Sequence, residues 1–334
     1  MFDWESLKAQ LNKTNQGFRS LKQLNISAHF PGYRQYEVIF ENEVFLLRYY
    51  PVKQKRPKRV FLCVYSLINQ VEILDFSRNN SLIYKLKNNK NAVFVIEWKK
   101  IKDKTIFHQL ETYFIDSIHL AVTQINFLYQ EKLIHLIGIC QGGIFALCYA
   151  SLFSEKLEKL ILLMTPSDSD CLFENIKLTV KKLLLLYKDE KIISAEFIQL
   201  FFSCLNPGKH YLTQGLNLLD SQKNQKKYLK IINWLYNSQD LSKAFILQYL
   251  DEILIENKLF NGNLDIGKYR INLSHIKVPV LNVYAKYDRL VPVDSAKNLK
   301  DKIDQKYYQE LALNSGHIGI FTENNMMNLL MEKI

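Results

Sequence analysis

The sequence predicts an α/β protein with a mainly parallel central sheet flanked by helices. Short runs rich in Val, Ile, Leu and Phe alternate along the chain with longer helical patterns, which is typical of such a sheet. The runs at 59–65 and 92–98 are almost entirely apolar, as expected of strands buried on both faces. The 334 residues suffice for one large domain or two small ones with a substantial core.

The expected elements follow one another along the chain. The first 30 or so residues have a helical pattern. Helices are also expected at 79–90, 105–130 and 323–334. Strands are expected at 36–40, 44–50, 59–65, 92–98, 133–139, 159–165, 278–288 and 306–313.

The alternation of strands and helices stops between about Pro166 and Gly262, where helical patterns dominate. We therefore expect one core made of residues 1–165 and 263–334, interrupted by a helical insertion at 166–262. A sheet interrupted late by helices is the usual plan of an α/β-hydrolase fold with a cap.

Composition excludes several classes of protein. The formal net charge is +11, but the basic residues are scattered and no zinc-finger, RRM or helix-turn-helix pattern accompanies them, which argues against a nucleic-acid-binding protein. The N-terminus lacks the apolar core of a signal peptide, and no apolar run reaches the roughly 18 residues of a membrane span. Cysteines are odd in number, without metal-type pairing. We expect a cytoplasmic protein with free thiols, no transmembrane segment and no metal.

The stretch LIHLIGICQGGIFALCYASLF (133–153) places a glycine-spaced turn between a strand and a helix. A nucleophile elbow has this form, with the reactive residue at a strained turn and small neighbours. Cys140 occupies the apex, Gly138 and Gly142 flank it, and Gly143 leaves room for close helix packing. The helix N-terminus that follows favours a thiolate and a developing oxyanion. The alternative is a buried structural cysteine at a tight turn.

Partners for Cys140 follow two later strands. In chains with this elbow the acid and the histidine come after the nucleophile, in that order. Asp288 ends VLNVYAKYD (280–288), and His317 follows the last strand in LALNSGHIG (311–319). Order and strand-end placement both predict a triad of Cys140, His317 and Asp288. For Asp288 alone, the alternative is a turn cap.

This triad predicts nucleophilic chemistry at a carbonyl carbon. His317 takes the thiol proton and the thiolate attacks, while Asp288 either orients the imidazole or polarises an incoming hydroxyl. The expected oxyanion donors are the backbone N–H of Gln141 and that of Ile68, in the loop after the third strand. A thiol exchanges one thioester for another with little change in energy, which favours acyl transfer over hydrolysis.

The motif GICQGG (138–143) resembles the cysteine lipase box of polyhydroxyalkanoate synthases, in particular their short, two-subunit class (class III/IV-like). The resemblance extends from about residue 35 to the C-terminus and is weakest between 166 and 230. It covers VYSLINQVEILDF (64–76), RNNSLIYKLKNNKNAVFVIEW (78–98), the long segment 233–292 and NSGHIGIF (314–321).

The resemblance implies an acyltransferase that polymerises (R)-3-hydroxyacyl-coenzyme A and releases coenzyme A. It implies that Cys140 carries the acyl group as a thioester, that His317 is the base and that Asp288 activates the 3-hydroxyl. It further implies a second, non-catalytic subunit and a location at cytoplasmic polymer granules. No cofactor is expected, because coenzyme A is part of the substrate and a product. Whether the chain forms a homodimer stays open.

The sequence departs from the family at several positions without losing a triad member. Arg289 stands where the family usually has histidine, and EW (97–98) replaces DW. Two other functions stay open beside the synthase. One is a cysteine hydrolase of the same fold, such as a thioesterase or a dienelactone-hydrolase-like enzyme. The other is a non-catalytic, granule-associated scaffold that kept the fold.

Overall fold

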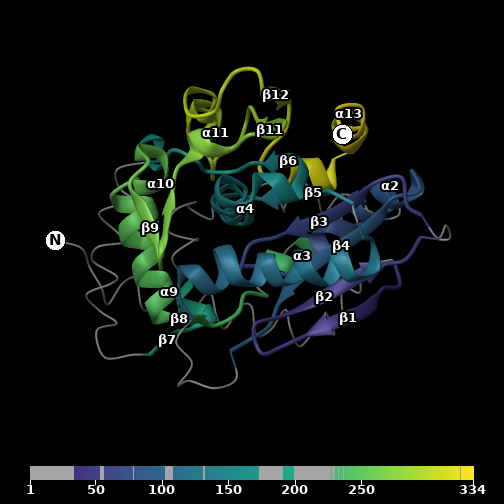
Figure 1. The fold of residues 1–334 in the computed structure, drawn as a ribbon, viewed down its shortest axis with the longest axis horizontal. Coiled ribbons are helices and arrows are strands. Elements are labelled where there is room, and N and C mark those ends of the chain that lie inside the picture. Colours follow the sequence, from purple (N-terminus) through teal and green to yellow (C-terminus); the bar gives the residue numbers. More distant parts are fainter. Residues whose placement is uncertain are drawn as a thin grey trace.

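The computed structural model describes residues 34–52, 56–77, 79–101, 108–130, 132–172, 191–198, 227, 230–231, 233–235, 237–323 and 325–334. An eight-stranded sheet runs through this part of the chain (Figure 1). Each of the eight predicted strands is present in it. They are β1 (Glu37–Glu41), β2 (Phe45–Tyr50), β3 (Val60–Val64), β4 (Ala92–Trp98), β5 (Ile134–Ile139), β6 (Leu157–Leu163), β11 (Val280–Ala285) and β12 (Tyr308–Leu313).

The strands lie in the order β1-β2-β4-β3-β5-β6-β11-β12. The β1–β2 and β2–β4 pairs are antiparallel, and the five remaining pairs are parallel. Every residue of β3, β5 and β11 is buried, as expected of strands covered on both faces. The edge strand β1 is partly exposed and has glutamate at both ends, which discourages pairing with another chain. The prediction of a mainly parallel sheet is confirmed.

Two apolar layers enclose the sheet. Along β3, Val60, Leu62 and Val64 point into the layer that also holds helices α3 (Ser117–Leu128) and α4 (Gln141–Leu152). Phe61 and Cys63 point into the layer that holds α2 (Leu82–Asn88) and α13 (Met326–Met331). This alternation follows from the two-residue period of a strand. It explains why β3 is apolar at every position.

Helices and turns connect the strands. The α-helices are α2 (Leu82–Asn88), α3 (Ser117–Leu128), α4 (Gln141–Leu152), α9 (Lys243–Gln248), α10 (Lys258–Asn261), α11 (Val293–Lys297), α12 (Gly319–Thr322) and α13 (Met326–Met331). The π-helical segments are η2 (Thr112–Asp116) and η5 (Tyr249–Ile255). The 3-10 turns are η1 (Val71–Asp75), η3 (Ser154–Lys156), η4 (Ser169–Cys171), η6 (Leu273–His275) and η7 (Asn298–Asp301). Among the helices described, none is long and apolar enough to cross a bilayer.

Helix α4 forms the centre of one layer. Its residues from Gln141 to Ser151 are all buried, because the helix packs against β5 and β6 on one side and against η2 and η6 on others. A helix covered all round is apolar all round. The residue at its N-terminus is therefore held by a rigid element.

Much of the predicted helical insertion at 166–262, including Cys204, lies outside the described residues, as does the helical lead-in. The described part contains α9, η5, α10 and the two-stranded ladder of β7 (Ile192–Ile193) and β8 (Leu241–Ser242). Neither of these strands joins the main sheet. The hairpin of β9 (Leu264–Ile266) and β10 (Tyr269–Ile271) follows before β11. The boundaries of the insertion stay a prediction.

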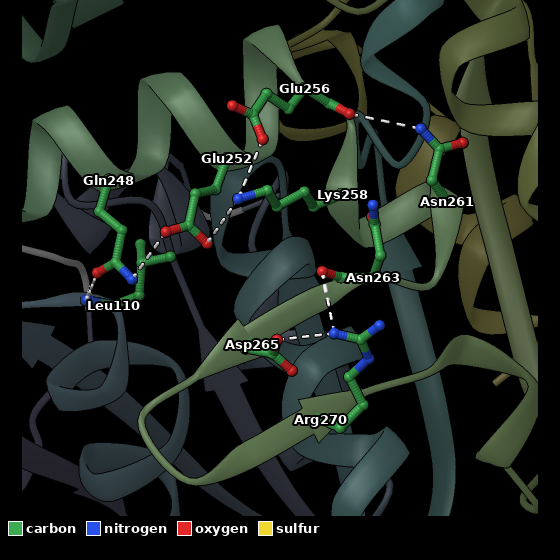
Figure 2. Close-up of polar contacts among 9 residues, drawn as sticks. All are labelled: Leu110, Gln248, Glu252, Glu256, Lys258, Asn261, Asn263, Asp265 and Arg270. Carbon is green, nitrogen blue, oxygen red and sulfur yellow. Dashed lines mark hydrogen bonds and ion pairs between the residues drawn. The ribbon is translucent and has the colours of Figure 1, made fainter.

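Polar contacts fix the last helical part of the insertion to the core, as Figure 2 shows. Gln248 accepts a hydrogen bond from the backbone N–H of Leu110 at 3.2 Å and donates one to Glu252 at 3.3 Å. Lys258 pairs with Glu256 at 3.0 Å and lies 3.9 Å from Glu252. The two ion pairs lie within the insertion, and partly exposed pairs of this kind contribute at most about 1 kcal/mol each. Among the contacts drawn, the Gln248–Leu110 bond is the one that joins the insertion to the core.

Candidate active site

Cys140 lies at the turn between β5 and α4, where its backbone has φ 52° and ψ −122°. A positive φ is strained for a residue with a side chain and persists only where its surroundings fix it. Here the Cys140 N–H donates to Leu163 O at 2.8 Å, and the Gly143 N–H donates to Cys140 O at 2.9 Å. The side chain is half-buried. The predicted strand-to-helix elbow with a thiol at its apex is present.

The three elbow glycines stand where a side chain has no room. A Cβ atom at Gly138 would lie 2.5 Å from the Gly143 Cα atom. At Gly142 it would lie 2.8 Å from the Tyr65 carbonyl, which is backbone and cannot rotate away. At Gly143 it would lie 2.7 Å from the Thr165 Cβ atom. The turn therefore needs all three glycines for steric reasons.

Asp288 and His317 meet at the carboxyl ends of β11 and β12. The His317 Nδ1 atom lies 2.7 Å from Asp288 Oδ2. The Asp288 Oδ1 atom accepts the backbone N–H groups of Leu290 and Val291, each at 2.9 Å. The Asp288 side chain is 1% exposed and that of His317 12%. Asp288 thus caps its turn with one oxygen and holds the imidazole with the other. It is both a turn cap and the partner of His317.

The Cys140 side chain completes the group, because it lies close enough to the His317 imidazole to act on its pKa. Because Nδ1 faces Asp288, Nε2 is the ring nitrogen left for the sulfur. Burial, the largest single influence, lowers the pKa of His317. The charges of Asp288 and Cys140 and their hydrogen bonds outweigh it and raise that pKa well above its ordinary value. The structure therefore brings the three predicted residues together in an arrangement that favours a protonated imidazole.

The two predicted oxyanion donors differ in their surroundings. Gln141 is the first residue of α4, so its backbone N–H belongs to the helix N-terminus next to Cys140. The Ile68 N–H donates to its own loop instead, to Ser66 Oγ at 3.0 Å. The role of Ile68 in binding an oxyanion stays a prediction.

The structure adds site residues that the sequence does not identify. Ser66 and the Gln141 side chain are hydrogen bonded to one another at 3.2 Å. The phenols of Tyr65 and Tyr249 are buried close enough to Cys140 for its charge to act on them. For both tyrosines burial is the main cause of a raised pKa. They carry no motif, and only Tyr65 lies at the end of a predicted strand (59–65).

One segment of the predicted insertion lies against the loop that follows β3. Asn69 Nδ2 donates to the backbone oxygens of Trp234 and Leu235 at 3.0 and 3.1 Å. Trp234 Nε1 in turn donates to Gln70 O at 2.9 Å. Trp234 also belongs to the apolar cluster against which Cys140, Ile231 and Leu235 pack. The insertion therefore reaches the site.

No group of three or more His, Cys, Asp or Glu side chains within the described ranges is arranged to hold a metal ion.

The family model described as "alpha/beta hydrolase fold" matches residues 104–324, more than half of the chain. Two solved structures share the fold. One is the monoacylglycerol lipase of Paleococcus ferrophilus, with a TM-score of 0.58 and 14% identity, covering 86% of this chain and 96% of that one. The other is an epoxide hydrolase of Bacillus megaterium, with a TM-score of 0.55 and 12% identity, covering 90% and 99%.

Curated relatives are similar along the sequence itself. The "Poly(3-hydroxyalkanoate) polymerase subunit PhaC" of Thiocystis violacea is 29% identical over 318 residues, which cover 93% of this chain and 89% of that protein. The proteins of that name from Allochromatium vinosum and Synechocystis sp. are each 27% identical and cover 92% and 96% of this chain, with 89% of each relative. These matches confirm the resemblance seen in the motifs. The chain therefore belongs to the α/β-hydrolase fold family and is similar over nearly its whole length to PhaC polymerase subunits.

Proposed function

We propose that this chain is the catalytic subunit of a polyhydroxyalkanoate synthase, an acyltransferase that polymerises (R)-3-hydroxyacyl-coenzyme A. The observation that carries the proposal is the Cys140–His317–Asp288 group at the end of the parallel strands, in a chain similar to PhaC subunits over 92–96% of its length. A scaffold that had lost its chemistry would not need a buried, hydrogen-bonded triad.

The first step transfers the acyl group to Cys140. His317 takes the thiol proton, and the thiolate attacks the thioester carbonyl carbon. The Gln141 N–H at the helix N-terminus stabilises the negative oxygen that forms. When the tetrahedral intermediate collapses, the bond to the coenzyme A sulfur breaks, and the His317 imidazolium protonates this leaving thiolate. Cys140 then carries the acyl group as a thioester.

The second step extends the chain. The 3-hydroxyl of the next acyl unit gives its proton to His317 and attacks the Cys140 thioester. A new ester bond forms, and the sulfur of Cys140 leaves and is reprotonated. The Asp288 carboxylate has both oxygens engaged, by His317 on one side and by Leu290 and Val291 on the other. This supports a role in orienting His317 over direct contact with the hydroxyl.

A second subunit and the surface of a polymer granule are the partners that we propose. The described contacts between Trp234 and the loop after β3 place the insertion against the loop that is expected to supply an oxyanion donor. A partner that moved residues 230–235 would change access to Cys140. Cytoplasmic granules are accordingly the location that we propose for the protein.

The test measures three products from (R)-3-hydroxybutyryl-coenzyme A: coenzyme A, free hydroxyacid and polymer. The purified chain is assayed alone and with the second subunit of a two-subunit synthase. The proposal predicts coenzyme A release with polymer as the acyl product. Free hydroxybutyrate in equal amount to coenzyme A identifies a hydrolase instead. If the folded protein releases no coenzyme A, with or without the subunit, it is neither a synthase nor a hydrolase of this substrate.

A further inference from the structure

The Gln141 side chain faces the loop after β3 and is buried. It is 4% exposed, and its Oε1 atom accepts two hydrogen bonds from that loop. One comes from the backbone N–H of Leu67 at 3.1 Å and the other from the hydroxyl of Ser66 at 3.2 Å. The hydroxyl oxygen of Ser66 accepts the Ile68 N–H at 3.0 Å. The three residues after Tyr65 are thus all tied, directly or through Ser66, to one amide oxygen.

A third segment contacts the same side chain. The Gln141 amide lies close enough to the phenol of Tyr249 to act on its pKa, and Tyr249 is the first residue of η5. Gln248, just before it, is fixed to Leu110 (Figure 2). Tyr249 also packs against Phe245, with ring centroids 5.7 Å apart. Its position is therefore set by the core, and the Gln141 side chain has little freedom to turn.

A buried amide with its hydrogen bonds made is a strong positional constraint, because breaking one of them leaves a buried polar group without a partner at a cost of about 1–3 kcal/mol. Ser66 and Leu67 are 5% and 1% exposed, so water does not readily replace the lost partner. The path of the loop is thus set by a residue that directly follows the nucleophile in sequence. This couples the two segments that are expected to supply oxyanion donors.

We propose that the Gln141 side chain is a positioning residue that fixes the second oxyanion donor relative to Cys140, and that Ser66 holds this donor, the Ile68 N–H, until a carbonyl oxygen arrives. The Ser66 hydroxyl turns away when substrate binds, and the Leu67–Gln141 bond keeps the loop in place. The inference rests on the proposed function only in requiring that Cys140 attacks a carbonyl group.

Two reactions of Cys140 distinguish a misplaced oxyanion donor from a general disruption of the site. Acylation forms a negative oxygen and needs the donors, whereas alkylation by iodoacetamide displaces iodide and forms no oxyanion. Both are followed by mass spectrometry of the Cys140 peptide, in Gln141→Met and in Ser66→Ala. In Gln141→Met we expect acylation to slow by about 10²-fold, the loss typical of one missing donor, while alkylation should stay within about threefold of the wild-type rate.

Ser66→Ala is expected to act in the opposite direction. It removes the acceptor that holds the Ile68 N–H but leaves the Leu67–Gln141 bond, so acylation should be as fast as in the wild type or faster. A loop that merely loosens would slow acylation in both variants. That result overturns the proposal, as does equal loss of acylation and alkylation in Gln141→Met. Wild-type acylation rates in Gln141→Met also overturn it.

Asn91→Leu is the matched control. Asn91 is a buried amide, 2% exposed, that donates to Leu86 O at 2.9 Å, between α2 and β4. Its loss should leave both reactions of Cys140 unchanged. Acylation is measured with (R)-3-hydroxybutyryl-coenzyme A and with p-nitrophenyl butyrate. If only the ester acylates the wild type, the proposed synthase function fails, while the comparison of Gln141→Met with Ser66→Ala remains decisive.

Discussion

His317 and Asp288 lie 2.7 Å apart, nitrogen to oxygen, and are contributed by the ends of two adjacent parallel strands, β11 and β12. The register of this pair sets the contact, because Ala285 is opposite Leu313 and the two loops leave the sheet side by side. Tyr287 donates its N–H to Ser315 O at 3.0 Å, which ties the loops together beyond the strands. The acid and the base of the site are therefore positioned by the sheet itself.

Replacing the nucleophile is the first test of the site. Cys140→Ala should abolish release of coenzyme A from (R)-3-hydroxybutyryl-coenzyme A, because no other group at the elbow apex can carry the acyl chain. Cys140→Ser should retain at most a small fraction of the rate. The measurement is a thiol assay of released coenzyme A. An alanine variant with the wild-type rate would mean that Cys140 is not the nucleophile.

The other cysteines supply the control for this test. Burial raises the pKa of Cys63 to about 12, and burial with the neighbouring Asp168 raises that of Cys171 to about 11. These thiols are therefore largely protonated at a pH of about 8 and should react slowly with iodoacetamide. Cys204 lies outside the described residues, so the experiment is done in a Cys204→Ser background. Labelling of Cys63 before Cys140 would contradict the assignment.

Asp288→Asn separates the two roles considered for this residue. The asparagine amide keeps an oxygen for the Leu290 and Val291 N–H groups but lacks the charge beside the imidazole. If Asp288 orients His317, acylation of Cys140 and chain growth should fall together, by on the order of 10³- to 10⁴-fold as in other triads. Rapid acylation without growth would instead show that Asp288 activates the hydroxyl. Quenched-flow detection of the acylated peptide, with polymer measured in parallel, distinguishes them.

The raised pKa of His317 predicts a pH dependence of stability. A group whose pKa is higher in the folded state adds stability that is complete below its unfolded pKa of about 6.5. That stability is lost as the pH rises through the folded value. Because the charges of both Asp288 and Cys140 raise the pKa, Cys140→Ala should lower it. An NMR titration of the His317 ring in wild type and Cys140→Ala measures this shift. An unchanged pKa would show that no thiolate lies beside the ring.

Replacing Gly142 tests whether the elbow lacks room for a side chain at this position. In Gly142→Ala the new methyl group would collide with Val64 O and lie 2.8 Å from the Tyr65 carbonyl, both backbone atoms. We expect the free energy of unfolding to fall by about 1–3 kcal/mol, as for other overpacked sites, with loss of Cys140 reactivity. Gly316→Ala is the control, because the nearest atom there is Tyr287 O at 3.8 Å. If urea denaturation showed the same loss of unfolding free energy in Gly142→Ala and Gly316→Ala, the steric explanation would be wrong.

The sequence predicts those parts of the molecule that follow from burial and strand order. The β strands are recognisable because β3, β5 and β11 are buried at every position. Asp288 and His317 are recognisable because each follows a strand. These signals are local, so they can be read from the sequence without knowing how distant segments pack.

The contacts around the oxyanion loop are not local. Ser66 and Gln141 are 75 positions apart, and Asn69 and Trp234 are 165 apart. The sequence predicts an oxyanion donor in the loop that contains Ile68, but it does not reveal that the Ser66 hydroxyl accepts the Ile68 N–H. Such pairs depend on side-chain packing between segments, which neither periodicity nor spacing encodes.

The contact between Asn69 and the insertion gives the last prediction. Asn69→Ala removes the hydrogen bonds to the backbone oxygens of Trp234 and Leu235, each worth about 1 kcal/mol. The amide hydrogens of 230–235 should then exchange faster, while those of β5 stay protected, because the loss is local. Asn272→Ala is the control, since its side chain likewise makes two hydrogen bonds, although it accepts them, both from Ser274 in turn η6. Unchanged exchange at 230–235 in Asn69→Ala would show that the apolar contacts of Trp234 alone hold this segment against the loop after β3.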